Sequence, residues 1–291
     1  MIDVTSDQGQ VLIGTVFGDG CLQNYWHTKK AALKLKHCAA QKEYVKWKSS
    51  MLNLKGLTVS KIRNGDTYQY GGQSHSLKEL YPFWETFYPS GKKIVPLDYL
   101  KALEPLGLAV WYCDDGSYQY WVNTLSLNTQ GFLKAGNELI KTFFEEVWDL
   151  RCTIIEQNIE GYDPYYYLCF NNDSTRRLLE IVKPHILKTK CMRYKLGPLL
   201  KENMPRVIEA RKKRRKYRMK RYWKNRDSIL EKQRKKRRLK GMKPKPRWTE
   251  DEIEYLEENF QNLTDKEIAN EINRSKPAVL QKRTRLGLRK R

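Results

Sequence analysis

The chain has 291 residues, 40% of them hydrophobic and 31% charged, and its formal net charge is +23 at pH 7. This composition favours a globular protein of one to three domains. No stretch approaches the roughly 20 apolar residues of a membrane span, and the first ten residues lack the features of a secretory signal. We therefore expect an intracellular protein without a membrane partner, in the cytoplasm or nucleoid of a bacterial or phage-infected cell, or in an organelle.

The cysteines do not predict a metal centre. None of the six forms a C-x-x-C pair, and the four histidines do not cluster with them in the sequence. Zinc sites need such groupings, so buried, reduced thiols are the better interpretation.

The first 97 residues contain the first of two similar series of predicted helices and strands. An apolar stretch from Val11 to Phe17 ends in Gly18-Asp19-Gly20 and reads as a helix that Ser6 can cap. Strands are expected near 21–27 and 32–38, and a helix over 41–54. A hairpin follows, with Asn64-Gly65 as its turn, and a helix over 76–88 closes this segment.

Residues 98–205 repeat that order. Leu108 to Cys113 is apolar, follows Pro105 and ends in Asp114-Asp115-Gly116. Strands are expected near 117–122 and 124–128, a helix over 134–149, strands near 152–158 and 164–170, and a helix over 173–183. Both copies read αββαββα, which predicts an α+β fold of two pseudo-symmetric repeats with antiparallel sheets. Two lysines share the register: Lys93 lies 74 residues after Asp19, and Lys195 lies 80 residues after Asp115.

The rest of the chain falls into two segments that differ strongly in net charge. Residues 206–246 contain 21 Lys and Arg against 3 Asp and Glu, a net of +18, whereas residues 1–205 carry +4 and residues 247–291 carry +1. Such a block predicts an exposed helical or disordered arm whose partner is a polyanion, most simply nucleic acid. Gly241, Pro244 and Pro246 end any helix there. Residues 247–291 predict a small module with helices near 250–259, 265–272 and 276–285.

Two carboxylates occupy equivalent positions in the repeats. Asp19 and Asp115 each follow an apolar helix, so they reach one site if the two helices pack side by side. Gly14 and Gly18 provide a small contact face for such packing. Fixed carboxylates hold the divalent cation that phosphodiester hydrolysis needs, and hard oxygen ligands suit Mg²⁺.

Both helix segments resemble motifs of the LAGLIDADG homing endonucleases. Residues 12–20, LIGTVFGDG, are similar to the motif that names the family, and residues 108–116, LAVWYCDDG, resemble the LAxWxxDDG form of its single-chain, two-repeat members. Residues 92–96, 127–130 and 192–196 also resemble that subgroup, so the resemblance covers roughly residues 9–200. Val110 and Asp114 depart from the glycine and alanine of the family name, which leaves the tightness of helix packing open.

The resemblance implies the roles of the site residues. Asp19 and Asp115 would bind the catalytic Mg²⁺ or Mn²⁺ ions, and the backbone carbonyls of Gly18 and Asp114 would add ligands. Lys93 and Lys195 would lie near the scissile phosphates and stabilise transition-state charge or position the attacking water. Solvated surface cations are the alternative for the two lysines.

The resemblance also implies that the two sheets form a saddle over double-stranded DNA and read its major groove. Polar side chains at alternate strand positions would face the bases, although a merely solvated sheet face is an equal alternative. The candidates are Gln23, Tyr25, His27, Lys34, Lys36, Arg63, Gln69, Gln119 and Asn123.

The last 45 residues resemble a Myb/SANT-like helix-turn-helix module. The resemblance rests on Arg247-Trp248-Thr249, Glu267-Ile268-Ala269, and Arg274-Ser275 leading into residues 286–288. Its third helix would then contact DNA, while a protein-contact module of the same fold is the alternative. The DNA-facing candidates are Lys276, Gln281, Lys282 and Arg285.

The resulting hypothesis is a monomeric enzyme that makes a metal-dependent double-strand break in a long DNA site. One alternative is a maturase that binds structured intron RNA, in which case splicing would survive loss of both aspartates. The other is a non-cleaving DNA-binding regulator, although such a protein would have no need of Asp19 and Asp115.

Overall fold

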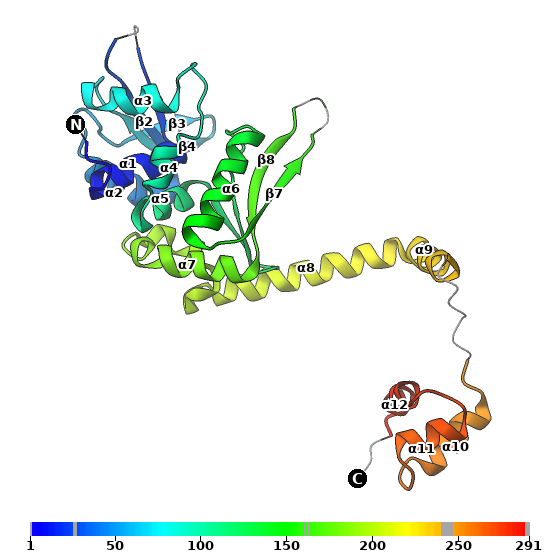
Figure 1. The fold of residues 1–291 in the computed structure, drawn as a ribbon. Coiled ribbons are helices and arrows are strands. Elements are labelled where there is room, and N and C mark those ends of the chain that lie inside the picture. The colour runs from blue at the N-terminus through cyan, green and yellow to red at the C-terminus, as the bar shows by residue number, and fades with distance from the viewer. Residues whose placement is uncertain (1, 26–27, 160, 162, 240–246, 289–291) are drawn as a thin grey trace. The chain divides into compact units, whose positions relative to one another are not determined.

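The computed structural model describes residues 2–25, 28–159, 161, 163–239 and 247–288 (Figure 1). The chain forms two compact units, residues 1–219 and residues 220–291. No helix among the described residues is long and apolar enough to span a membrane.

The first repeat builds one four-stranded antiparallel sheet of order β1-β2-β4-β3. Ser6 caps its first helix by accepting a hydrogen bond from the amide of Gly9, as the sequence predicts. The predicted helix over 76–88 is divided into two pieces, the short η2 and then α3, which begins at Tyr81 and has Pro82 in its first turn. The elements are α1 (Asp7–Phe17), β1 (Cys21–Gln23), β2 (Ala32–Cys38), η1 (Ala39–Gln41), α2 (Lys42–Leu52), β3 (Ser60–Asn64), β4 (Thr67–Gln73), η2 (Lys78–Leu80), α3 (Tyr81–Phe87) and α4 (Leu97–Lys101).

The second repeat builds the same sheet, of order β5-β6-β8-β7. Its first strand ends at Gln119, earlier than predicted, because residues 120–123 form a turn in which Asn123 adopts φ +58°. The equal strand orders confirm the predicted α+β fold of two pseudo-symmetric repeats. The elements are α5 (Pro105–Asp115), β5 (Gly116–Gln119), β6 (Thr124–Leu127), α6 (Lys134–Trp148), β7 (Cys152–Gln157), β8 (Tyr165–Phe170), α7 (Asn172–Ile186), η3 (Lys190–Leu199) and η4 (Lys201–Asn203).

Helices α1 and α5 pack directly against each other in the centre of the first unit (Figure 1). A Cβ added to Gly14 would lie 2.3 Å from the carbonyl oxygen of Gly107, so glycines on both helices permit the close approach. The predicted contact face is thus completed by Gly107, one position before the second motif, and by Val110 within that motif, whose Cβ would lie 2.9 Å from the added Cβ. Phe17 stacks on Trp111 at 4.9 Å, which joins the two repeats in one hydrophobic core.

Helix α8 (Met204–Lys224) begins as part of the first unit, which ends at Met219. Val207 is completely buried, and the Arg211 guanidinium donates a hydrogen bond of 2.9 Å to Asn123 Oδ1. The sequence placed the boundary of the basic arm at 205/206, whereas residues 204–219 belong to the first unit, with Val207 buried and Arg211 bonded to Asn123 of the second repeat. The high charge of this segment predicts an exposed helix, so the burial of one side of its first turn was not predicted. Helix α9 (Arg226–Leu239) follows, and Gly241, Pro244 and Pro246 lie outside the described residues.

The end of the chain folds as three short helices, as predicted: α10 (Glu250–Asn259), α11 (Asp265–Glu271) and α12 (Lys276–Arg285). Thr249 and Thr264 each start a helix with a capping box, in which side chain and backbone satisfy each other. An ion pair between Arg283 and Asp265, at 3.0 Å, ties α12 to α11. A small core closes the module and contains Leu256, Ile268, Ala269 and Val279.

Candidate active site

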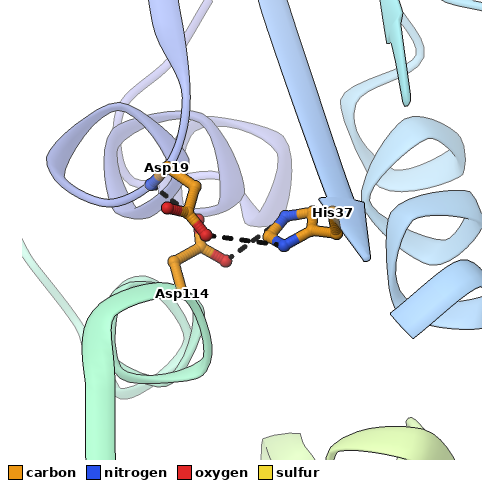
Figure 2. A group of neighbouring side chains, drawn as sticks. All are labelled: Asp19, His37 and Asp114. Atoms are coloured by element: carbon orange, nitrogen blue, oxygen red, sulfur yellow. Dashed lines mark hydrogen bonds and ion pairs between the residues drawn. The ribbon is translucent and has the colours of Figure 1, made fainter. Parts of the chain in front are cut away.

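Three side chains meet where α1 and α5 end (Figure 2). Asp19 follows α1, Asp114 is in the last turn of α5, and His37 projects from β2. Asp19 Oδ2 lies 3.5 Å from His37 Nδ1, and Asp114 Oδ1 lies 3.7 Å from His37 Nε2. One ligand atom from each residue lies within 4.8 Å of the others, so the group could hold a metal ion.

His37 is a site residue that the sequence analysis missed. It lies on β2, where buried and exposed positions alternate, and it shares the buried face with Leu33 and Leu35. A polar residue at a core position of an otherwise regular strand was the available signal. Burial lowers the pKa of His37 to about 4, with the nearby Lys48 charge adding to the effect. The imidazole is therefore neutral at pH 7 and can accept a hydrogen bond or a metal ion.

The side chain of Asp114 is fully buried and accepts hydrogen bonds from three residues of the first repeat. It accepts hydrogen bonds from Lys48 Nζ at 2.9 Å and from Tyr44 Oη at 2.8 Å, both on α2. It also accepts one of 3.2 Å from the backbone amide of Asp19. The sequence assigned only the backbone carbonyl of Asp114 a role, whereas the structure places its carboxylate at the junction of the repeats.

Asp115 lies in the same electrostatic environment as Asp19. Burial raises the pKa of Asp115 to about 8, and the negative charges of Asp19 and Asp114 contribute further. The pKa of Asp19 is raised by the same two causes, burial first and then Asp114, although 45% of its side chain is exposed. Crowded carboxylates of this kind repel each other until a cation neutralises them. Their oxygen donors fit Mg²⁺ or Mn²⁺.

Lys93 and Lys195 occupy corresponding places in the two repeats. Lys93 Nζ donates to the carbonyl oxygens of Phe17 at 3.3 Å and Gly18 at 3.2 Å, at the end of α1. Lys195 Nζ, at the end of α5, donates to several carbonyl oxygens: those of Tyr112, Cys113, Asp114 and Gly116. Both ammonium groups thus hold carbonyls that a helix end leaves unpaired. Burial lowers the pKa of both lysines, so neither is an ordinary solvated cation.

Most of the candidate base-reading residues share one face of their sheets. Lys34 pairs with Gln73 and Cys21 across the first sheet, so Gln23, Lys34, Lys36 and Gln69 face the same side. Gln119 lies on the outer face of the second sheet together with Ser117. Arg63, in contrast, has the strand parity of His37 and so belongs to the opposite face.

Two of the three further base-reading candidates, Tyr25 and Asn123, do not lie within the strands of the two sheets. Tyr25 is exposed and follows β1, and its hydroxyl donates to Gln23 Oε1. Asn123 Oδ1 accepts hydrogen bonds from Tyr118 and Arg211, so this side chain serves the packing of α8. His27 lies outside the described residues.

In the last module the predicted DNA-facing side chains come from α12. Lys276, Gln281 and Arg285 are exposed. Lys282 is half-buried and lies over the Trp248 ring, 5.7 Å from its centroid. This contact positions Lys282 beside the module's own core.

The comparisons with known proteins agree with this geometry. Residues 9–178 match the family model described as the LAGLIDADG DNA endonuclease family. The chain belongs to the LAGLIDADG DNA endonuclease family. The homing endonuclease I-WcaI, solved bound to its DNA recognition sequence, has the same fold: its TM-score is 0.56 at 22% identity, over 67% of this chain and 88% of that one.

Curated relatives fall into different kinds. Protein RecA of Mycobacterium gastri is 30% identical over 67% of this chain and 48% of its own length, so the chain spans about half the length of that relative. DNA endonuclease I-ChuI of Chlamydomonas applanata is 21% identical over 67% of this chain and 97% of its length. The cytochrome b mRNA maturase bI2 of Debaryomyces hansenii is 28% identical over 48% of each chain.

Proposed function

We propose that this LAGLIDADG protein is a single-chain, two-repeat homing endonuclease that makes a Mg²⁺- or Mn²⁺-dependent double-strand break in a long DNA site. The observation that carries the proposal is the meeting of Asp19, His37 and Asp114 at the ends of two packed helices, where Asp115 lies at the end of α5 and its pKa is raised by burial and by the charges of the other two aspartates. Raised carboxyl pKa values are expected where several carboxylates lie close together without the cation that would neutralise them. A monomer suffices, because one chain supplies both halves of the site.

The residues divide the chemistry among themselves. Asp19 and Asp115 would hold the divalent ions, which supply an activated water and neutralise charge on the leaving oxygen. Lys93 and Lys195 would stabilise the phosphate charge that develops at each strand. The neutral His37 imidazole, beside Asp19, can accept a proton or a hydrogen bond from water there. Asp114, tied to Lys48, would fix the backbone of Asp19.

The basic segments would add affinity for DNA. Residues 206–246 carry a net +18, and cations of this density neutralise phosphates without reading sequence. The three-helix module at the end resembles a Myb/SANT-like helix-turn-helix, and we propose that α12 contacts DNA through Lys276, Gln281 and Arg285. The base-reading set on the two sheets would supply the specificity of the core.

The decisive test replaces each catalytic carboxylate separately. Asp19→Asn and Asp115→Asn should abolish double-strand cleavage of the target duplex in Mg²⁺ or Mn²⁺, while DNA binding persists. Asp98→Asn, at an exposed position in the first turn of α4, is the matched control and should cut normally. Near-normal cutting by both motif variants would refute the endonuclease assignment.

A second candidate is intron maturation, which the similarity to the bI2 maturase favours. In that case the protein binds structured intron RNA through the same fold. Splicing of the cognate intron should then survive the Asp19→Asn and Asp115→Asn changes, because RNA folding needs no metal-activated water. Splicing that proceeds equally well without the protein would contradict this second role.

A further inference from the structure

An exposed apolar tip stands out on the second repeat. Trp121 and Val122, in the turn between β5 and β6, are 45% and 46% exposed. Large apolar side chains placed together at the surface commonly mark a binding site. The turn is held rigidly, because Asn123 adopts φ +58° and its side chain accepts hydrogen bonds from both Tyr118 and Arg211.

One face of α8 completes a pocket with this tip. Ala210, Lys213, Arg214 and Tyr217 follow the spacing i, i+3, i+4 and i+7, which places them on one side of the helix. Together with Trp121 they line a pocket of about 410 Å³. Ala210 leaves room at its centre, and the Arg214 guanidinium lies 5.8 Å from the centroid of the Trp121 ring. Tyr217 is 57% exposed at the end of the pocket.

The combination of side chains indicates the ligand. Duplex DNA buries its base faces in the stack and offers cationic side chains mainly phosphates. Aromatic rings and guanidinium planes become useful when a base is unpaired and can stack on them. Two accessible aromatic rings and two cations that line one pocket therefore fit a nucleotide that presents both a free base and a phosphate.

We propose that this pocket binds an unpaired nucleotide of a single strand. Its base stacks on Trp121 beside Tyr217, and its phosphates contact Lys213 and Arg214. The pocket shares no residue with the Asp19–His37–Asp114 group. Binding of a single strand is therefore an activity separate from cleavage, and the proposal stands independently of the endonuclease assignment.

The test uses the full chain and short labelled oligonucleotides of thymidine or uridine, with a duplex of unrelated sequence as comparison. Fluorescence anisotropy is measured near 0.3 M salt, where the Debye length is below about 8 Å and long-range attraction is weak. Trp121→Ala should weaken single-strand binding about tenfold, the size expected for loss of one stacked base. Duplex binding should change less than twofold. Trp121→Phe, which keeps a ring, should retain most of the single-strand affinity.

Matched controls separate the pocket from general charge. Trp223→Ala removes another tryptophan of α8, 61% exposed but outside the pocket. Arg215→Ala removes the same charge as Arg214→Ala from the opposite side of the helix. Both controls should leave single-strand binding near the wild-type value, while Arg214→Ala weakens it. The Arg214/Arg215 pair also decides the matter if Trp121→Ala fails to fold.

The outcomes are discriminating. A selective loss with either oligonucleotide supports the proposal, and the strand type that shows it identifies DNA or RNA as the source of the nucleotide. Equal losses in the pocket variants and their controls, or equal losses for single strand and duplex, would overturn it. The tip would then serve only to pack α8 against the hairpin.

Discussion

The two halves of the candidate active site differ at the residue before Asp19 and Asp115. The first repeat has Gly18 and the second has Asp114, and these positions face each other across the helix pair. A Cβ added to Gly18 would lie 2.6 Å from the Cβ of Asp114. Only one of the two positions can therefore carry a side chain. The pseudo-symmetry breaks at the contact because two equal side chains do not fit there.

The Asp114 side chain of the second repeat extends to the first repeat, where Gly18 leaves room for it. The Asp114 carboxylate, on α5, pairs with Lys48 of α2 and accepts a hydrogen bond from the backbone of Asp19. No such link exists in the opposite direction, because Gly18 has no side chain. Asp19 of the first half is thus held by the second half, whereas Lys93 and Lys195 each donate hydrogen bonds within their own repeat.

The largest effect on folding is expected at the buried ion pair. Lys48→Met leaves the Asp114 carboxylate buried without its cation, and Asp114→Asn leaves the Lys48 ammonium without its anion. Loss of one partner of a buried pair typically costs about 3–5 kcal/mol. Denaturant unfolding would measure this loss. Lys46→Met, exposed on the same helix, should change the free energy of unfolding by less than about 0.5 kcal/mol.

The same experiment shows whether the ion pair between Lys48 and Asp114 stabilises the contact between the repeats. Should Lys48→Met unfold at the same denaturant concentration as Lys46→Met, the Asp114 carboxylate is not held by this ion pair. The two repeats would then be joined by apolar packing and by the remaining hydrogen bonds, such as those that Asp114 accepts from Tyr44 and from the Asp19 backbone.

The next effect compares the paired lysines. Lys93→Ala and Lys195→Ala should each slow cleavage by on the order of 100-fold, the usual cost of one electrostatic donor at a reacting group. Since each lysine belongs to one repeat, each variant should accumulate DNA nicked in one strand, and the nicked strands should be opposite. Single-turnover cleavage on strand-specific labels measures both rates. Lys92→Ala and Lys201→Ala, at exposed neighbouring positions, are the controls.

An unchanged rate in both lysine variants would make these residues structural caps of α1 and α5 only. Slowing of both strands by a single variant would instead show that the two halves are not independent. Either result would sharpen the comparison between repeats, because the hydrogen bonds of the two lysines are so alike.

Repeat structure was what made the fold predictable from the sequence. Apolar periodicity, the Asn64-Gly65 turn and the paired registers of Lys93 and Lys195 are local signals, and the two sheets follow from them. Gly107 and Lys48 were not predictable in this way. Their importance depends on which residues face them across the helix contact, and that information is not local in the chain.

The site was predicted in part for the same reason. Asp19 and Asp115 stand out because they repeat, whereas His37 and the Asp114 side chain occur once each. Similarly, the first turn of α8 looked like a solvated arm, because Val207 and Ile208 are followed directly by a long basic run and only Val207 is buried. Unique residues become recognisable only when the fold brings their partners together.

The smallest expected effect is a pH dependence of the free energy of unfolding that comes from Asp115. Its pKa is raised to about 8 in the folded protein from an ordinary 3.8. Between those values the folded state binds more protons than the unfolded state, so without metal the free energy of unfolding falls as pH rises. His37, with its pKa lowered to about 4 from 6.5, has the opposite slope, but only below pH 6.5. The effect of Asp115 should therefore be clearest between pH 6.5 and 8.

Thermal or denaturant unfolding in a chelator should show this decline, at most about 1.4 kcal/mol per pH unit for one proton. Asp115→Asn should flatten the slope relative to the wild type. Saturating Mg²⁺ or Mn²⁺ should flatten the wild-type slope as well, because a bound cation favours the ionised carboxylate and releases its proton. Equal slopes for wild type and Asp115→Asn in the chelator would mean that Asp115 is ionised without metal. The crowding of carboxylates at the helix ends would then not be what prepares this site for a cation.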